Sequence, residues 1–158
     1  MSDEGISNNV TQQLNRIVAG QDASASLRTH VFALLRDQMV ASEMSFDVDD
    51  DIVFRYQGRH FMAVFDRRDD RYLRIVFSPF HQASDSDDIL KSLTAIALVN
   101  FQIKGAKLWA HQNLGILTVA ASVELWLVRD EDLDENFMER LISTLFTVVH
   151  EFRSLISG

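Results

Sequence analysis

Cysteine is absent from this sequence of 158 residues, so disulfide bonds, thiolate nucleophiles and cysteine-ligated zinc are excluded. Basic residues are scarce too: 15 Lys and Arg stand against 23 Asp and Glu, for a formal net charge of −8. Such a chain repels phosphate backbones, so we do not expect a nucleic acid partner. No apolar run reaches the roughly 18 residues of a membrane helix, and Met1–Asn9 lacks the parts of a secretory signal. We therefore expect a cytoplasmic protein with no membrane segment.

The motifs that carry most enzyme chemistry are also missing. The six glycines form no phosphate-binding loop, no serine stands in a nucleophile elbow, and the five histidines lack metal-ligand spacing. We expect no catalytic residues, no metal and no cofactor. The acidic run Asp47–Asp51 begins like a calcium loop. However, Ile52 and Gly58 stand where that loop needs glycine and glutamate, so we interpret the run as a hairpin turn.

What is present is a regular succession of amphipathic patterns. A helical period over 27–39 is followed by four alternating runs over 44–77, a helical period over 89–103, an alternating hairpin over 106–127 and a last helix over 133–155. This predicts an α+β fold of order α-ββββ-α-ββ-α with an antiparallel sheet. We expect Pro79 to end the fourth strand. The stripe Val10–Val18 predicts an extra short helix, so the chain divides into an N-terminal extension, 1–26, and a single domain, 27–158.

Alternation within the strands predicts which side chains form the core. Pairing Phe54 with Ala63, and Ala63 with Ile75, puts the aromatic residues of the first strands on one face. A turn at Asn113-Leu114 pairs Leu108 with Val119 and Ala110 with Leu117 on that same face. In the first helix, Arg28 is expected to lie off the apolar side.

The opposite face of the sheet, which should be wet, is more apolar than a solvent face needs to be. It also holds both tryptophans of the protein, and Trp and Arg are typical interface anchors. We expect this face to contact a polypeptide partner or a second copy. The predicted interface residues are Val53, Met62, Val64, Val76, Trp109 and Trp126. The alternative is that the Val10–Val18 helix covers part of this face within the same chain.

The order of elements, in a small acidic chain without cysteine, resembles the type III secretion chaperone-like fold and, within it, the YbjN-like family of bacterial proteins. The resemblance covers about Leu27–Ile156. Its most similar stretch is LVNFQIKGAKLWAHQNLGILTVAASVELWL, in which Asn100 lies where that family often has Asn; the hairpin FDVDDDIVFRYQG is similar as well. The resemblance implies a non-enzymatic, usually dimeric, cytoplasmic module that holds an extended segment of a partner. The relatives are mostly uncharacterised, some being described as regulators, and no functional residue carries over.

Two classes of function therefore stand. The first is a homodimeric protein-binding or regulatory module of uncharacterised biological role, from which a purely structural domain of a regulatory system cannot be separated by sequence. The second is a small-molecule-binding domain or enzyme whose site is built from distant residues, with His111, Glu124 or Asp66 near a pocket. A deep pocket with converging polar groups would favour the second, and a flat apolar face the first.

Overall fold

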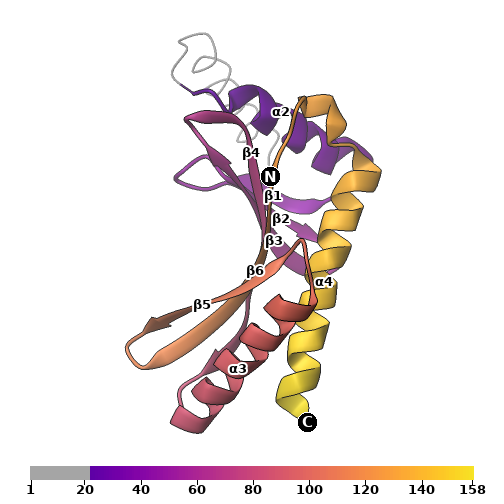
Figure 1. Cartoon of the computed structure of the whole chain (residues 1–158). Coiled ribbons are helices and arrows are strands. Elements are labelled where there is room, and N and C mark those ends of the chain that lie inside the picture. Colours follow the sequence, from indigo (N-terminus) through magenta and orange to yellow (C-terminus); the bar gives the residue numbers. More distant parts are fainter. Residues whose placement is uncertain (1–21) are drawn as a thin grey trace.

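The computed structural model describes residues 22–158. These residues form a six-stranded antiparallel sheet with helices on one of its faces (Figure 1). The elements are, in chain order, α2 (Ala25–Ala33), a π-helical turn η1 (Leu34–Gln38), β1 (Ser42–Phe46), β2 (Ile52–Tyr56), β3 (Arg59–Asp66), β4 (Asp69–Ala83), α3 (Ser86–Gln102), β5 (Lys107–Asn113), β6 (Ile116–Trp126), a 3₁₀ turn η2 (Asp130–Asp132) and α4 (Glu135–Ser157). The α+β class and the antiparallel sheet are confirmed. The Val10–Val18 helix lies outside the described residues, and the domain limits stay a prediction.

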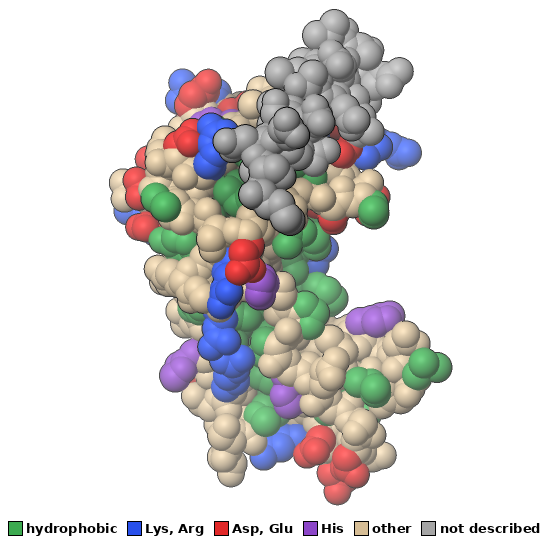
Figure 2. All heavy atoms as spheres, turned by 180° about the vertical axis from the view of Figure 1, so that it is seen from behind, with side chains coloured by type: hydrophobic (Ala, Val, Ile, Leu, Met, Phe, Trp, Pro, Cys, Tyr) green, Lys and Arg blue, Asp and Glu red, His purple; other side chains and the backbone are tan. Residues whose placement is uncertain are grey.

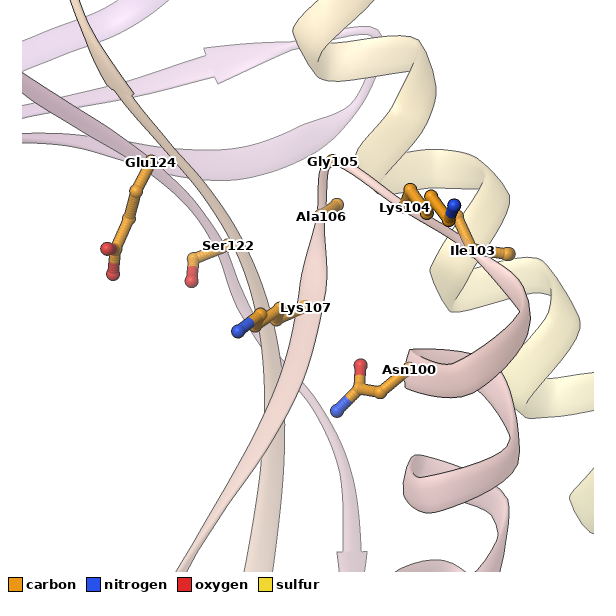
Figure 3. A pocket seen from close by; sticks show the side chains of 8 residues that line it. All are labelled: Asn100, Ile103, Lys104, Gly105, Ala106, Lys107, Ser122 and Glu124. Carbon is orange, nitrogen blue, oxygen red and sulfur yellow. The ribbon is translucent and has the colours of Figure 1, made fainter.

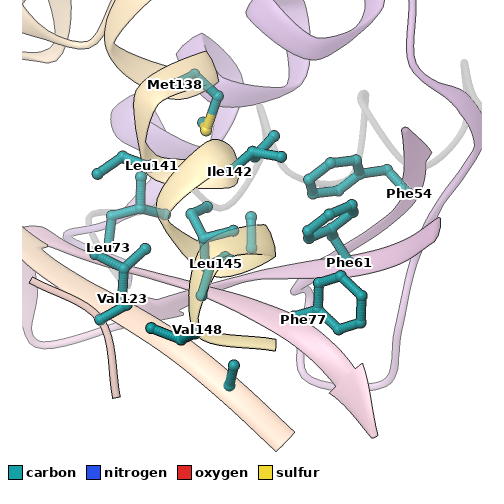
Figure 4. Packing of buried hydrophobic residues seen from close by; sticks show 14 of the residues in the cluster. Phe54, Phe61, Leu73, Phe77, Val123, Met138, Leu141, Ile142, Leu145 and Val148 are labelled. Carbon is teal, nitrogen blue, oxygen red and sulfur yellow. The ribbon is translucent and has the colours of Figure 1, made fainter. Parts of the chain in front are cut away.

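The strands are arranged in the order β1-β2-β3-β4-β6-β5, so β1 and β5 are the edges of the sheet. Ala63 lies opposite Ile75, as predicted, but Phe54 lies opposite Phe61 rather than Ala63. That error is two residues. Because side chains alternate with a period of two, the predicted core face survives it. Phe54, Phe61 and Phe77 all point to the face that carries the helices (Figure 4).

The β5–β6 hairpin corrects another predicted register. The turn is Leu114-Gly115, with φ of 49° and 81°, and not Asn113-Leu114. Two successive positive φ values are the mark of a type I′ turn, whose twist suits a two-residue hairpin loop. Leu108 therefore lies opposite Ala121, and Ala110 opposite Val119. The shift is again two residues, so the predicted face is correct.

The prediction that Pro79 ends the fourth strand is wrong. β4 runs on to Ala83, and its pairing with β6 is interrupted only between Phe77 and His81. Proline cannot donate a hydrogen bond to a neighbouring strand. A strand can therefore accommodate a proline where its pairing is irregular, as it is here. The run Asp47–Asp51 does form the turn between β1 and β2. The Asp47 carboxylate accepts the backbone N–H groups of Asp49 and Asp51 at 2.9 Å each.

The core lies between the sheet and the long helix α4. This helix begins at Glu135 and is capped by Asp134, whose carboxylate accepts the N–H of Phe137 at 2.8 Å. Its buried residues recur at helical spacing along the sequence and pack on the strands (Figure 4). The buried residues of α4 are Met138, Leu141, Ile142, Leu145, Val148, Val149 and Phe152.

Arg28 on α2 is buried, 1% exposed, although its position suggested a wet side. Its guanidinium donates to Asp22 at 2.6 Å and to the Ser24 hydroxyl at 2.8 Å, and lies 5.0 Å from the ring centre of Phe65. Burial alone would raise the pKa of Asp22, but the hydrogen bonds from Ser24 and Arg28 and the charge of Arg28 outweigh it and hold that pKa below its usual value. The start of the described chain is thereby fixed to the sheet by a charged cluster.

Candidate interaction surface

All six predicted interface residues lie on the face of the sheet that carries no described helix, which we call the outer face. Val53, Met62 and Val76 lie opposite one another on β2, β3 and β4 and form an apolar row. Val64 is next along β3, opposite Arg74. The row is only partly open. Val53, Met62 and Val64 are half-buried, whereas Val76 is 6% exposed and offers a partner almost no surface.

The two tryptophans lie in different surroundings. Trp126 is 64% exposed at one end of β6, where its indole N–H donates to Asp69 at 3.1 Å and its ring meets Tyr72 edge-on. Burial, and after it the negative charge of Glu124, raises the pKa of Tyr72 above its usual value. Trp109 is half-buried on the edge strand β5. Of the two tryptophans, Trp126 therefore presents the more open aromatic surface.

Arg74 and Trp109 form a bridge over β6. The guanidinium of Arg74, on β4, lies 5.3 Å from the ring centre of Trp109, on β5, and strand β6 runs between them. This geometry explains why Ala120 and Ser122, two small residues of β6 on the outer face, are buried. Glu124 lies opposite Arg74, with 3.6 Å between its carboxylate and the Arg74 Nε. Side-chain alternation along β4 puts Arg74 on the outer face, but no sequence pattern gives a sign of this bridge.

Three hydrogen-bond donors on the outer face are buried and find no acceptor within the part of the chain that the structure describes. They are the Nε atoms of Arg55 and Arg74 and the indole Nε1 of Trp109. Arg55 does use another nitrogen, donating to Glu43 at 2.8 Å, and the Arg74 Nε faces the Glu124 carboxylate at 3.6 Å, as an ion pair too long for a hydrogen bond. Buried polar groups almost always find a partner, so three unused donors on one sheet face indicate hydrogen bonds still to be made. Arg55 was not among the residues predicted for the interface.

Seen from behind, hydrophobic side chains lie at the surface beside a row of Lys and Arg, and the outline is hollowed on one side (Figure 2). The β5–β6 hairpin projects away from the rest of the sheet, so the outer face is concave rather than flat (Figure 1). A concave face that carries apolar residues together with Arg55 and Arg74 suits a chain segment lying along it better than a small ligand enclosed by it.

A cavity of about 430 Å³ lies where α3 ends and β5 begins (Figure 3). Lys107, Ser122 and Glu124 point to its outer-face side, and Asn100 points from α3 toward β5. The Asn100 carboxamide is already used. It donates to the Leu108 carbonyl at 2.9 Å and accepts the Leu108 N–H at 2.8 Å, so it holds α3 to the edge strand.

The residues of the enzyme hypothesis do not come together. Glu124 lines this cavity, but His111 lies opposite Thr118 near the hairpin tip and Asp66 is the last residue of β3. Thr118 and Glu124 are six residues apart on one strand, which is about 20 Å. Between residues 22 and 158, no group of three or more His, Asp or Glu side chains could hold a metal ion. Of these three residues, the structure therefore brings Glu124 alone to this cavity, and the three do not form one site.

Residues 22–158 are of the α+β class, and one face of their antiparallel sheet carries no described helix. A comparison of the chain with models of known families, with curated proteins and with solved structures finds no match. Among residues 22–158, no helix is both long and apolar enough to cross a membrane.

Proposed function

We propose that this protein is a non-enzymatic, protein-binding module that works as a homodimer and accepts an extended polypeptide segment along the outer face. The observation that carries the proposal is the conjunction of an apolar row with unused donors. Val53 and Met62 supply the apolar contact, and the Nε and Nε1 atoms of Arg55, Arg74 and Trp109 supply the donors. A segment in extended conformation presents a backbone carbonyl at every residue, which is the acceptor that these donors lack.

The similarity to secretion chaperones and to YbjN-like proteins belongs to this proposal, as does a cytoplasmic location. The order of the described elements agrees with the resemblance seen in the sequence, α-ββββ-α-ββ-α. In such a module affinity comes from a few anchors surrounded by weaker contacts. Trp126 is the most exposed of the predicted anchors, and Met62 is the most adaptable because an unbranched thioether can repack around different side chains.

The fluorescence of the two tryptophans can report peptide binding to the outer face. Both tryptophans lie on the outer face, so a segment bound there changes their fluorescence. A Trp126→Phe variant isolates Trp109, and this variant is titrated with an array of extended peptides of varied composition. We expect a subset of peptides to shift the Trp109 emission, with affinities in the micromolar range typical of a short exposed segment.

A variant in the apolar row and a variant at the hairpin turn separate outer-face binding from other effects. Met62→Glu places a charge in the apolar row and should lower peptide affinity at least about 10-fold. Leu114→Glu, at a hairpin-turn residue that is 95% exposed, is the matched control and should leave affinity unchanged. Thermal unfolding of both variants checks that they fold. Peptides that never shift the emission, or that bind Met62→Glu as tightly as the parent, would refute the proposal.

A further inference from the structure

Helix α3 is apolar on two opposite sides. Ser92, Ala95 and Val99 face the sheet and are buried, and the helix is fixed at its start by Asp85, whose carboxylate accepts the N–H groups of Asp87 and Asp88. Leu93 and Ala97, which belong to the helical period predicted over 89–103, are exposed. A helix that packs by one side only is expected to be polar on the other.

The exposed side of α3 carries a stripe of large hydrophobic residues. Leu90 is 65% exposed, Leu93 45%, Leu98 44% and Phe101 85%. Their spacing of 0, 3, 8 and 11 is that of one helix face, interrupted at its centre by the small residues Thr94 and Ala97. A groove of about 480 Å³ runs beside the stripe and is closed on its other side by Leu155 of α4. The two helices lie side by side at the margin of the molecule (Figure 1).

The size of this surface is that of half an interface. The four stripe residues and Leu155 together expose about 500 Å², near the upper end of the range for the largest apolar patch on a monomer. Two such surfaces in contact would bury about 1,000 Å², the lower limit for a specific protein–protein interface. Scattered exposed hydrophobic residues need no explanation, but a stripe of this size does.

We propose that the stripe on α3 is the contact between two copies of this chain, with the two α3 helices packed antiparallel about a two-fold axis between residues 95 and 96. In this arrangement Leu90 of one copy meets Phe101 of the other, and Leu93 meets Leu98. Thr94 and Ala97, both small, meet at the crossing, where helix backbones must approach closely. This inference names the surface of the homodimer in the proposed function and rests on that part of it.

The charges at the two ends of α3 agree with the same register. Asp87, in the acidic first turn, would face Lys104, which lies just beyond the last turn (Figure 3). Both side chains are exposed, and Asp87 also lines the groove. Within one chain they are about 25 Å apart along the helix, too far to interact, so the pairing exists only between copies. A parallel arrangement would instead bring the acidic ends of both helices together.

The test measures the dimer dissociation constant of the full chain by sedimentation equilibrium in low salt. Phe101→Glu should raise it at least about 30-fold, which corresponds to the loss of one interface anchor. Leu114→Glu, equally exposed but on the hairpin, is the matched control and should not change it. Asp87→Lys and Lys104→Asp each create two repulsive pairs and should raise it about 5-fold. The double variant Asp87→Lys/Lys104→Asp restores attraction and should return it to the parental value.

Each outcome of these measurements either supports the proposed dimer contact or overturns it. A protein that stays monomeric at about 100 μM, or a dimer that Phe101→Glu leaves intact, would overturn it. A dimer that Phe101→Glu dissociates but that the double charge reversal fails to restore would overturn the antiparallel register and with it the inference. Peptide binding on the outer face, read from Trp109, is independent of these outcomes. A monomer that still binds peptide would therefore refute the dimer surface and leave the peptide-binding role standing.

Discussion

The side chain of Asn100 makes the hydrogen bonds to the edge strand β5 that a neighbouring strand would otherwise make. β5 is an edge strand, and the outward N–H and C=O of Leu108 would otherwise face no partner. The carboxamide of Asn100 offers one donor and one acceptor, as a peptide group does, and bonds to both at 2.8 and 2.9 Å. No other side chain of similar length carries this pair of groups in the right order.

Replacing Asn100 with Ala should lower the free energy of unfolding by about 2 kcal/mol, since each hydrogen bond contributes about 1 kcal/mol. Asn100→Asp should cost at least as much at pH 7, because a carboxylate keeps the acceptor but turns a second oxygen toward the Leu108 carbonyl. Below about pH 4 the protonated carboxyl can donate again, so the deficit of Asn100→Asp should shrink there, whereas that of Asn100→Ala should not.

Urea unfolding measures the stability of each variant, and amide hydrogen exchange reports on Leu108 directly. We expect the Leu108 amide to be protected in the parent protein, although it points away from the sheet, and to exchange fast in Asn100→Ala. Gln102→Ala, at the exposed last residue of α3, is the control for helix effects. A loss below about 0.5 kcal/mol with Leu108 still protected would show that the reasoning is wrong.

Two further predictions concern pH. The ring of His81 lies 3.0 Å from the buried Ser92 hydroxyl, and burial lowers the pKa of this histidine, so its protonation disfavours the folded state. The free energy of unfolding should therefore fall as the pH drops below about 6.5, and should fall less in His81→Gln. Urea titrations at several pH values measure this. Asp51 accepts the Phe65 N–H at 3.0 Å, and burial raises its pKa above the usual aspartate value of 3.8. Ionisation of Asp51 therefore lowers the free energy of unfolding as the pH rises above 3.8. Asp51→Asn keeps the acceptor and should be the more stable protein at pH 7 but not at pH 3; equal stability at both would contradict this account.

The candidate surface could be predicted from the sequence to the extent that it depends on alternation. Val53, Met62 and Trp109 were placed on the correct face even where the strand register was wrong, because an error of two residues leaves side-chain direction unchanged. Exposure along that face could not be predicted. Val76 is buried and Trp126 is open because of their neighbours across the sheet, and those neighbours come from distant parts of the chain.

The exposed stripe on α3 did have a signal in the sequence. Leu90, Leu98 and Phe101 lie outside the side of α3 that packs on the sheet, and so many large hydrophobic residues outside one face indicate a second contact. What periodicity alone could not decide was which of the two apolar sides faces the sheet. Val99 and Leu93 are equally apolar, and only the packing against β5 and α4 selects between them.

By itself the sequence determined the succession of elements, the antiparallel α+β class and the parity of each strand, since these follow from local periodicity and turn-forming residues. Only the tertiary structure decided the registers, the burial of Arg28, the role of Asn100 and the bridge between Arg74 and Trp109. Each of these joins residues from separate elements. A polar or charged side chain becomes buried or paired through the groups that folding brings to it, and a local pattern contains no information about those groups.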